Sequence, residues 1–250
     1  MLGELQTLRK KFNIATANST KVIALVGNPN TGKSTIFNAL TGLRQHTGNW
    51  PGKTVIQAQG EFSYKQKDFL LVDLPGIYSL FPHSPDEQVA RDFLCFAHPD
   101  ITIAVADATC LERNLSLILQ IIEITPRVVL CVNLMDEAKR KKIKIDINCL
   151  ERELGIPVIP TVARNGEGIK ELKIVLNNFT HRQGDPTPYY IDYGNYIEKR
   201  IKKIERQLTA FNTSRLINPR WLALRILEED KDINEALRYY FNWDGEVQCH

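Results

Sequence analysis

Up to residue 179, apolar positions along the chain follow two alternating patterns. Short continuous apolar runs, typical of strands buried on both faces of a parallel sheet, alternate with stretches that have one apolar helix face. Strands are expected over 21–27, 54–64, 67–72, 101–106, 128–134 and 158–162. Helices are expected over 33–43, 86–96, 114–124, 147–154 and 168–179. The alternation predicts an α/β fold with a mostly parallel six-stranded sheet.

A change of pattern after this region indicates further domains. The stretch 182–188, RQGDPTP, has the composition of a linker. After it only helical spacing remains, over 197–208, 221–227 and 233–241. Asn218 and Pro219 are expected to be the N-cap and first residue of the second of these helices. We predict an N-terminal extension with a loosely docked helix over 1–20, an α/β domain over 21–182 and a small all-helical domain over 183–250.

The composition of the 250 residues is that of an ordinary globular protein, with 43% hydrophobic residues and a net charge of +3. Such a balance does not indicate a nucleic-acid partner, and the basic run over 139–144 is interpreted as a solvated helix end. Five cysteines without CxxC spacing argue against a zinc site, and Cys110 and Cys131 are expected to be buried free thiols. No apolar window is long enough to span a membrane, so this part is predicted to be soluble, alone or as a piece of a larger membrane protein.

The strongest chemical signal is GNPNTGKS over 27–34, between the first predicted strand and the first predicted helix. In this GxxxxGK[ST] pattern, a glycine-bounded loop points backbone N–H groups at phosphate oxygens, and the helix N-terminus adds partial positive charge. Lys33 supplies a cation for the β- and γ-phosphates, and the Ser34 hydroxyl is a ligand suited to Mg²⁺. The pattern favours a nucleotide site over a chance glycine-rich turn.

The segment NLMD over 133–136 indicates which nucleotide base is bound. It ends an apolar strand at the edge of a parallel sheet where nucleotides bind. The Asp136 carboxylate can accept from N1–H and the exocyclic amine of guanine, a donor pair that adenine lacks. Asn133 would brace the loop and reach the base. An isolated NxxD is usually a turn, but its position after a phosphate loop and a DxxG favours a guanine site.

Two further segments complete the predicted site. In DLPG over 73–76, Asp73 would hold a water of the Mg²⁺ shell and the Gly76 N–H would face the γ-phosphate. A β-turn made by Pro75 and Gly76 is the alternative explanation of this segment. TVARNG over 161–166 ends the last strand, where its backbone would contact the guanine carbonyl.

The segment over 44–54, RQHTGNWPGKT, is long, polar and rich in Gly and Pro, which predicts a mobile loop. Thr54 is the candidate for the second hydroxyl ligand of Mg²⁺, and Thr47 is the competitor. For Trp50 two alternatives stay open, an exposed ring or a ring packed over the nucleotide.

The phosphate loop, the DxxG segment and the NxxD segment follow one another along the chain in the order typical of GTPases. In this they resemble the Ras-like, translation-factor-related GTPases. GNPNTGKSTIFNALTG, HTGNWPGKT, DLPGIYSL, NLMDEAKRKKIKIDI and RWLALRILEED together resemble the N-terminal cytoplasmic part of the ferrous iron transport protein B family. The resemblance implies a Ras-like P-loop domain that binds GTP and GDP and hydrolyses GTP, followed by a helical domain that stabilises the GDP state. In that family a membrane domain that moves Fe²⁺ follows. This implies a place at the cytoplasmic face of the bacterial inner membrane, with that membrane domain as partner and as a route to oligomerisation.

The resemblance also implies which residues bind nucleotide and metals. Nucleotide contacts are implied for Gly27, Asn28, Pro29, Asn30, Thr31, Gly32, Lys33, Ser34, Thr35, Gly52, Lys53, Thr54, Asp73, Leu74, Pro75, Gly76, Asn133, Leu134, Met135, Asp136, Thr161, Val162 and Ala163. Mg²⁺ would be held by Ser34, Thr54 and, through water, Asp73. Potassium-activated relatives have Asn at the position of Asn30, so K⁺ would be held by Asn30 and the carbonyls of Gly48 and Trp50. The implied catalytic group is Lys33, Asn30, Thr54 and Gly76.

Some positions depart from the Ras-like pattern. Ile77 replaces the water-orienting Gln, which predicts slow hydrolysis that relies on K⁺, Mg²⁺ and backbone groups. Leu134 replaces a Lys that stacks on guanine, and Val162 stands where Ser is common, so weaker nucleotide binding is expected. Two alternatives stay open: a soluble ribosome- or tRNA-associated P-loop GTPase, and a nucleotide-binding interaction module with negligible hydrolysis.

Overall fold

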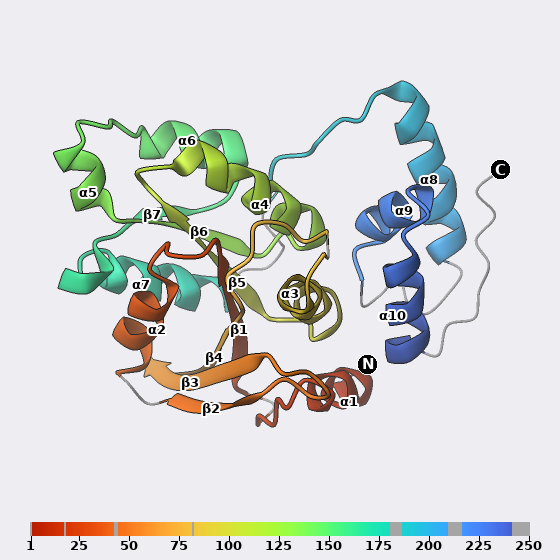
Figure 1. Ribbon diagram of the computed structural model, residues 1–250, viewed down its shortest axis with the longest axis horizontal. Helices are drawn as coiled ribbons and strands as arrows, with labels where there is room; N and C mark the ends of the chain where they lie inside the picture. The colour runs from red at the N-terminus through yellow and green to blue at the C-terminus, as the bar shows by residue number, and fades with distance from the viewer. Residues whose placement is uncertain are drawn as a thin grey trace.

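The computed structural model describes residues 2–17, 19–42, 45–81, 83–180, 187–209 and 217–241. Within these residues, seven strands form one sheet in the order β2-β3-β4-β1-β5-β6-β7 (Figure 1). The strands are β1 (Lys21–Gly27), β2 (Gln45–Asn49), β3 (Ile56–Tyr64), β4 (Lys67–Asp73), β5 (Ile101–Asp107), β6 (Val128–Asn133) and β7 (Val158–Pro160). The predicted α/β class is confirmed, whereas the predicted count of six strands is wrong by one.

The additional strand, β2, lies within the segment that the sequence predicted to be a mobile loop. It pairs antiparallel with β3, with Gln45 opposite Gly60 and Asn49 opposite Ile56. Its residues, QHTGN, show no alternation of apolar and polar positions, because an edge strand can be held by its backbone without burying a face. The hydrophobic pattern therefore could not distinguish this strand from a loop.

The strands β4, β1, β5, β6 and β7 run parallel to one another. Their register aligns Leu25 with Asp73 and Asp107 with Asn133, so the strand ends that carry the predicted motifs meet along one edge of the sheet. β3 runs antiparallel to β4 with Ala58 opposite Asp73, which places the loop before β3 beyond the same edge. The topology thus brings distant motifs to one place.

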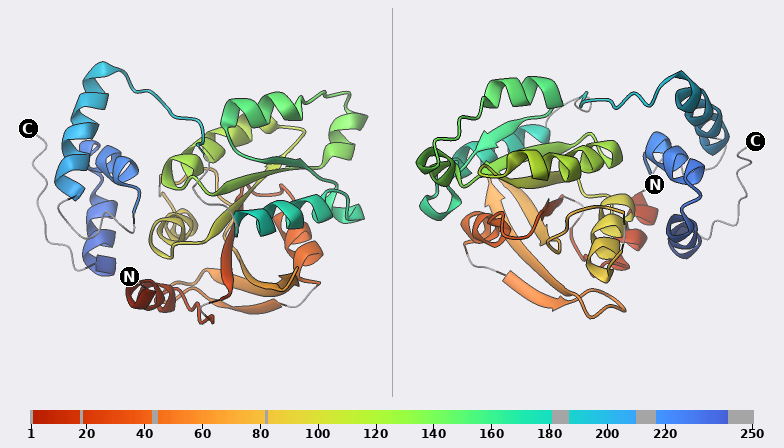
Figure 2. Two further views of the ribbon diagram at one scale, coloured as in Figure 1. Left: turned by 180° about the vertical axis from the view of Figure 1, so that it is seen from behind. Right: turned by 45° about the horizontal axis from the view of Figure 1, so that its top comes forward.

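Helices cover both faces of this sheet (Figures 1 and 2). Alternate residues of β1 point to opposite faces: Ile23 packs with Phe37 and Leu172 in one buried cluster, and Ala24 packs with Phe93 in the other. The helices of this part are α1 (Leu2–Lys10), α2 (Lys33–Thr41), α3 (Pro85–Phe96), α4 (Leu111–Ile124), α5 (Met135–Arg140), α6 (Ile147–Leu154) and α7 (Ile169–Phe179), with the short 3₁₀ helix η1 (Ala163–Asn165). The first cluster lies under α2 and α7, and the second under α3 and α4.

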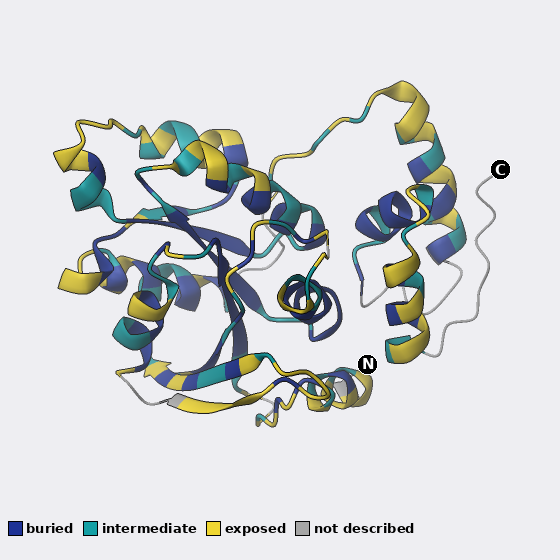
Figure 3. Ribbon diagram, in the orientation of Figure 1, coloured by how far each residue is buried: buried dark blue, intermediate teal, exposed yellow. Residues whose placement is uncertain are grey.

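The C-terminal part of the described chain is helical, as predicted. Its helices are α8 (Asn195–Thr209), α9 (Pro219–Leu227) and α10 (Lys231–Phe241). Asn218 caps α9, as expected, by accepting from the amides of Arg220 and Trp221, and its Nδ2 donates to the carbonyl of Glu123 in α4 at 2.8 Å. Figure 3 shows buried residues on the sides of these helices that face one another and the α/β domain. The predicted domain boundary at 182/183 lies outside the described residues.

Several local expectations can be compared with the structure. The N-terminal helix is present, but it is docked more closely than predicted, because Leu8, Phe12 and Ile14 are at most 4% exposed.

Cys131 is buried as expected, whereas the prediction for Cys110 is wrong: Cys110 is exposed at the start of α4, just after the buried strand has ended. The basic run does form an exposed helix end. Among the described helices, none has both the length and the apolar character needed to cross a bilayer.

Candidate nucleotide site

The loop over 28–32 connects β1 to α2 at the edge where the parallel strands end. Gly32 has a φ of 86°, and a Cβ at this position would lie 2.3 Å from Nδ2 of Asn133. A Cβ on Gly27 would lie 2.4 Å from the carbonyl oxygen of Val105. Only glycine fits at these two positions, so the motif's glycines let the loop pack directly against β5 and β6.

Lys33 begins α2 and turns its ammonium group back over this loop. Its Nζ donates to the carbonyl oxygens of Gly27 and Asn28 at 3.2 and 3.3 Å. A Cβ on Gly76 would lie 3.1 Å from the same Nζ, which shows how closely the DxxG segment approaches. Burial lowers the pKa of Lys33, and the nearby carboxylate of Asp73 opposes that shift. The structure therefore brings together the predicted phosphate loop and the DxxG segment around one cation.

Asp73 ends β4 on the other side of this cation. Burial raises its pKa to about 6, although the charge of Lys33 acts in the opposite direction. Its Oδ1 is buried and has no hydrogen-bond partner, and the same is true of Oδ1 of Asn28 in the phosphate loop. Unpartnered buried oxygens are costly unless a ligand satisfies them. This arrangement fits a site that a hydrated cation and phosphate groups complete.

The protein side chains alone do not form a metal centre in the described part of the chain. It contains no group of three or more His, Cys, Asp or Glu residues placed to hold an ion. Ser34 lies in the exposed first turn of α2, next to Lys33. Mg²⁺ keeps several waters and commonly takes its remaining ligands from substrate phosphates. Ser34 and Asp73 fit such an ion, which nucleotide phosphates would help to hold.

Asn133 connects the phosphate loop to the base-reading loops. Its side chain is 1% exposed. Its Nδ2 donates to the carbonyl oxygen of Thr31 at 3.0 Å, and its Oδ1 accepts from Thr161 Oγ1 at 3.0 Å and from the amide of Ala163 at 3.1 Å. The prediction that Asn133 braces the loop is confirmed, and its reach to the base stays a prediction.

Asp136 lies in the first turn of α5, after Leu134 has turned the chain with a φ of 64°. One carboxylate oxygen is paired with the guanidinium of Arg164. The other, Oδ1, is buried and has no hydrogen-bond partner. Arg164 belongs to η1 and lines a surface groove together with Ala163 of the same short helix and Thr35 of α2. The sequence analysis assigned no role to Arg164. The only feature that could have drawn attention to it is its position as a cation within the segment TVARNG.

The remaining DxxG and base-loop residues have mainly backbone contacts. The amide of Leu74 donates to the carbonyl of Leu25 at 2.9 Å, and the amide of Met135 donates to the carbonyl of Thr161 at 3.3 Å. The side chain of Ile77 is 1% exposed and belongs to the hydrophobic core, so it is not available to position a water molecule. These contacts hold the two loops at the sheet edge.

The loop before β3 contacts a different part of the molecule. Trp50 is 2% exposed and packs on Phe93 of α3 at 5.4 Å between ring centroids, which excludes the exposed alternative and leaves the ring away from the phosphate loop. Nζ of Lys53 donates to Gln88 of α3 at 2.6 Å. Thr54 is exposed, and Thr47 is exposed on β2. The amide of Lys53 donates to the Trp50 carbonyl at 3.0 Å, and neither of these two Lys53 hydrogen bonds joins the loop that carries Gly52 and Thr54 to the phosphate loop.

Comparison with known protein families gives two matches along the chain. A family model described as ferrous iron transport protein B matches residues 21–176. A model described as the FeoB cytosolic helical domain matches residues 193–247. The first 20 residues lie before both matches.

Individual proteins show the same similarity. The chain is 38% identical over 213 residues to the Fe(2+) transporter FeoB of Salmonella typhimurium, which covers 83% of this chain and 27% of that protein. The chain thus spans about a quarter of the length of the curated relatives it matches. The cytosolic domain of T. maritima FeoB in its GDP form I has a TM-score of 0.79 at 39% identity, covering 93% of this chain and 89% of that one. Its GMPPNP form has a TM-score of 0.78 at 40% identity, covering 91% and 88%.

Proposed function

The chain belongs to the ferrous iron transport protein B family, and on this premise we propose that it is a GTP-binding, slowly GTP-hydrolysing part of an Fe²⁺ transporter. The observation that carries the proposal is the meeting of the phosphate loop, Asp73 and Asp136 at one sheet edge, with a buried, unpartnered oxygen on each carboxylate. The GDP and GMPPNP forms of the T. maritima relative support guanine nucleotides as the ligands.

At the phosphate end, loop amides and Lys33 bind the β- and γ-phosphates, and the Gly76 N–H faces the γ-phosphate. Ser34 and Thr54 would hold Mg²⁺ directly, and Asp73 would hold it through water. Mg²⁺ supplies positive charge that offsets the charge developing on the phosphates. In the described conformation Trp50 packs on Phe93 of α3 and Lys53 donates to Gln88 of the same helix. The loop over 50–55 is thus withdrawn from the phosphate loop and has to rearrange before Thr54 can act as a ligand.

At the base end, the Asp136 carboxylate accepts from guanine N1–H and the exocyclic amine, and its oxygen without a protein partner is available for one of these two donors. Thr161, Val162 and Ala163 present their backbone to the guanine carbonyl, and Asn133 keeps this loop in register with the phosphate loop. A carboxylate in this position disfavours adenine, because adenine would leave it without a donor.

Hydrolysis is expected to depend on K⁺. Ile77 is buried and cannot orient the attacking water, so a K⁺ held by Asn30 and the carbonyls of Gly48 and Trp50 would supply charge at the transferring phosphate. Phosphate release from GTP should be roughly tenfold faster in KCl than in NaCl, since such a cation does part of what an arginine finger contributes. The Asn30→Asp variant should lose this difference.

The control for the K⁺ experiment is Asn178→Asp, which makes the same chemical change at an exposed position of α7. It should keep the wild-type ratio of rates in the two salts. Equal rates in KCl and NaCl for the wild type, or a ratio that survives in Asn30→Asp, would remove K⁺ from the proposal. No phosphate release in either salt, together with tight GTP binding, would instead favour an interaction module without hydrolysis.

For the whole protein, the proposal follows from relatives about four times as long as this chain. The chain would act at the cytoplasmic face of the bacterial inner membrane, beside a membrane domain that moves Fe²⁺, with oligomerisation through that domain. The helical part, α8 to α10, would stabilise the GDP state. The ribosome- or tRNA-associated alternative is not favoured, because both parts of the chain match this family.

A further inference from the structure

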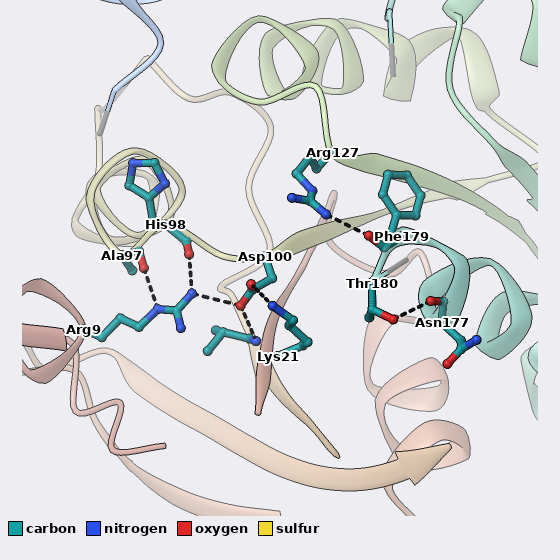
Figure 4. A network of polar contacts seen from close by, with 10 residues as sticks. Arg9, Lys21, Ala97, His98, Asp100, Arg127, Asn177, Phe179 and Thr180 are labelled. Atoms are coloured by element: carbon teal, nitrogen blue, oxygen red, sulfur yellow. Dashed lines mark hydrogen bonds and ion pairs between the residues drawn. The ribbon is translucent and has the colours of Figure 1, made fainter. Parts of the chain in front are cut away.

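The N-terminal segment over 2–17 lies before the family matches, yet it is anchored to the α/β domain. The guanidinium of Arg9 donates to the carbonyl oxygens of Ala97 at 3.3 Å and His98 at 2.6 Å, and pairs with Oδ2 of Asp100 at 3.0 Å (Figure 4). Asp100 also pairs with Nζ of Lys21 at the start of β1, at 3.1 Å. Arg9 and Asp100 are only 12% and 20% exposed, so this is a partly buried network rather than a surface ion pair.

Phe12 of this segment is the centre of an aromatic cluster from four parts of the chain. Its ring stacks on Tyr240 of α10 at 5.2 Å between centroids, and meets Phe93 of α3 edge-on at 5.6 Å. It also meets Trp50 edge-on at 6.4 Å. Aromatic pairs at these separations contribute beyond the area they bury. Phe12 therefore packs at once against the loop before β3, α3 and the helical domain.

Polar contacts fix the same segment to both strands that flank Trp50. Nε2 of Gln57, a side chain that is 3% exposed, donates to the carbonyl of Phe12 at 2.9 Å. Nε2 of Gln59 donates to the carbonyl of Asn13 at 3.2 Å, and Nδ2 of Asn13 donates to the carbonyl of Asn49 at 3.4 Å. The segment thus holds the hairpin of β2 and β3 on either side of its loop.

The segment also reaches the last described helix. Nζ of Lys11 donates to the carbonyl of Tyr239 at 2.8 Å and lies 4.8 Å from the centre of the Tyr239 ring. Tyr240 in turn stacks on Phe96 of α3 at 4.4 Å. The N-terminal segment, α3 and α10 therefore form one packed unit, and Trp50 is its fourth member.

Burial of Trp50 in this unit leaves one polar group unsatisfied. Nε1 of Trp50 is buried without a hydrogen-bond partner, which costs free energy. The Trp50 carbonyl oxygen, in contrast, accepts from the amide of Lys53 at 3.0 Å. A cavity of about 330 Å³ lies beside the ring, lined by Trp50, Lys53, Asp92 and Tyr240 among others. The unpartnered indole N–H and the adjacent cavity both lower the stability of this packed position. If Trp50 moved out of it, water could accept a hydrogen bond from the indole N–H.

We propose that residues 2–17 are an intramolecular clamp that stabilises the loop over 50–55 in this withdrawn position and couples it to α10. The inference rests on the proposed function, in which Thr54 and the Trp50 carbonyl have to reach metal ions at the phosphates. Contacts that exist only in the withdrawn state oppose that movement. By reciprocity, a GTP analogue that draws the loop to the phosphates weakens the hold of the segment on α10.

The first test measures affinities for GDP and GMPPNP by calorimetry in the wild type, Phe12→Ala and Arg9→Ala. Both substitutions should raise the affinity for GMPPNP relative to GDP by about tenfold, a usual size for coupling between sites. Lys10→Ala removes an exposed cation of the same helix and should leave the ratio unchanged. Unchanged ratios in both clamp variants, or an equal loss of both nucleotides, would overturn the proposal.

The second test uses the wild type only, so it tests the proposed clamp even if Phe12→Ala fails to fold. Amide hydrogen exchange of the wild type should be faster in 9–14 and 231–241 with GMPPNP than with GDP. Equal exchange in the two states would overturn the clamp while leaving nucleotide binding intact. A wild type that binds neither nucleotide would instead refute the proposed function, and with it the clamp, which depends on that function.

Discussion

GTP hydrolysis by the Lys33→Ala variant is expected to be about 10²–10³-fold slower than by the wild type, the usual effect of removing one group that stabilises transition-state charge. Lys33 is partly buried and burial lowers its pKa, so its removal relieves a burial cost and should not unfold the domain. The variant also removes the cation that holds down the pKa of Asp73, which should rise further above about 6. Single-turnover phosphate release with saturating GTP measures the effect.

Lys141→Ala, at the exposed end of α5, is the matched control for the loss of one lysine and should hydrolyse GTP at the wild-type rate. In the full-length protein, the proposed role in Fe²⁺ transport predicts that Lys33→Ala also reduces uptake of radiolabelled Fe²⁺ by cells to the level of cells without the gene. Wild-type hydrolysis in the isolated variant would contradict the assignment of the phosphate loop. Normal uptake alongside lost hydrolysis would contradict only the link to transport.

The second large effect is a change of base preference in Asp136→Asn. The new amide would direct a donor at the N1–H and amine of guanine, and GDP affinity should fall by roughly 10⁴-fold, as in sites built to match a hydrogen-bonding group. Xanthine has a carbonyl where guanine has its amine, so affinity for XDP should rise. Calorimetric titration of the variant with GDP, XDP and ADP measures both changes.

Glu137→Gln is the control for this change, because it neutralises the neighbouring carboxylate, which pairs with Arg140 rather than facing the base site. It should keep the wild-type order of affinities. An Asp136→Asn variant that still prefers GDP would show that Asp136 does not read the base. Arg164, which pairs with Asp136 in the described structure, would then need to be considered as a competing occupant of that carboxylate.

The sequence predicted the core of the fold because strands buried on both faces have an unmistakable pattern. β1, β5 and β6 are continuous apolar runs, and almost all of their residues are buried. β2 was missed because QHTGN buries no face and pairs only at the sheet edge, so its strand character depends on β3. The exposure of Cys110 was missed for a related reason, since the apolar run before it ends at a helix start rather than continuing.

Much of the site was also predictable, because parallel strands end at one edge and the motifs follow those strands. The bracing role of Asn133 agreed with the structure for this reason. The position of Trp50 was not predictable, because its neighbour Phe12 is supplied by a segment outside the motif pattern. The anchor of that segment joins Arg9 to Asp100, 91 positions apart, and no local pattern reports such a pair.

The most direct measurement is a pair of calorimetric titrations of the unmodified protein, with GDP and with ADP, in the presence of Mg²⁺. The account predicts saturable binding of GDP and an affinity for ADP weaker by at least about 10²-fold, since adenine cannot supply the donor pair that Asp136 accepts. Comparable affinities for the two nucleotides, or no heat with GDP, would contradict the central claim that this sheet edge is a guanine nucleotide site.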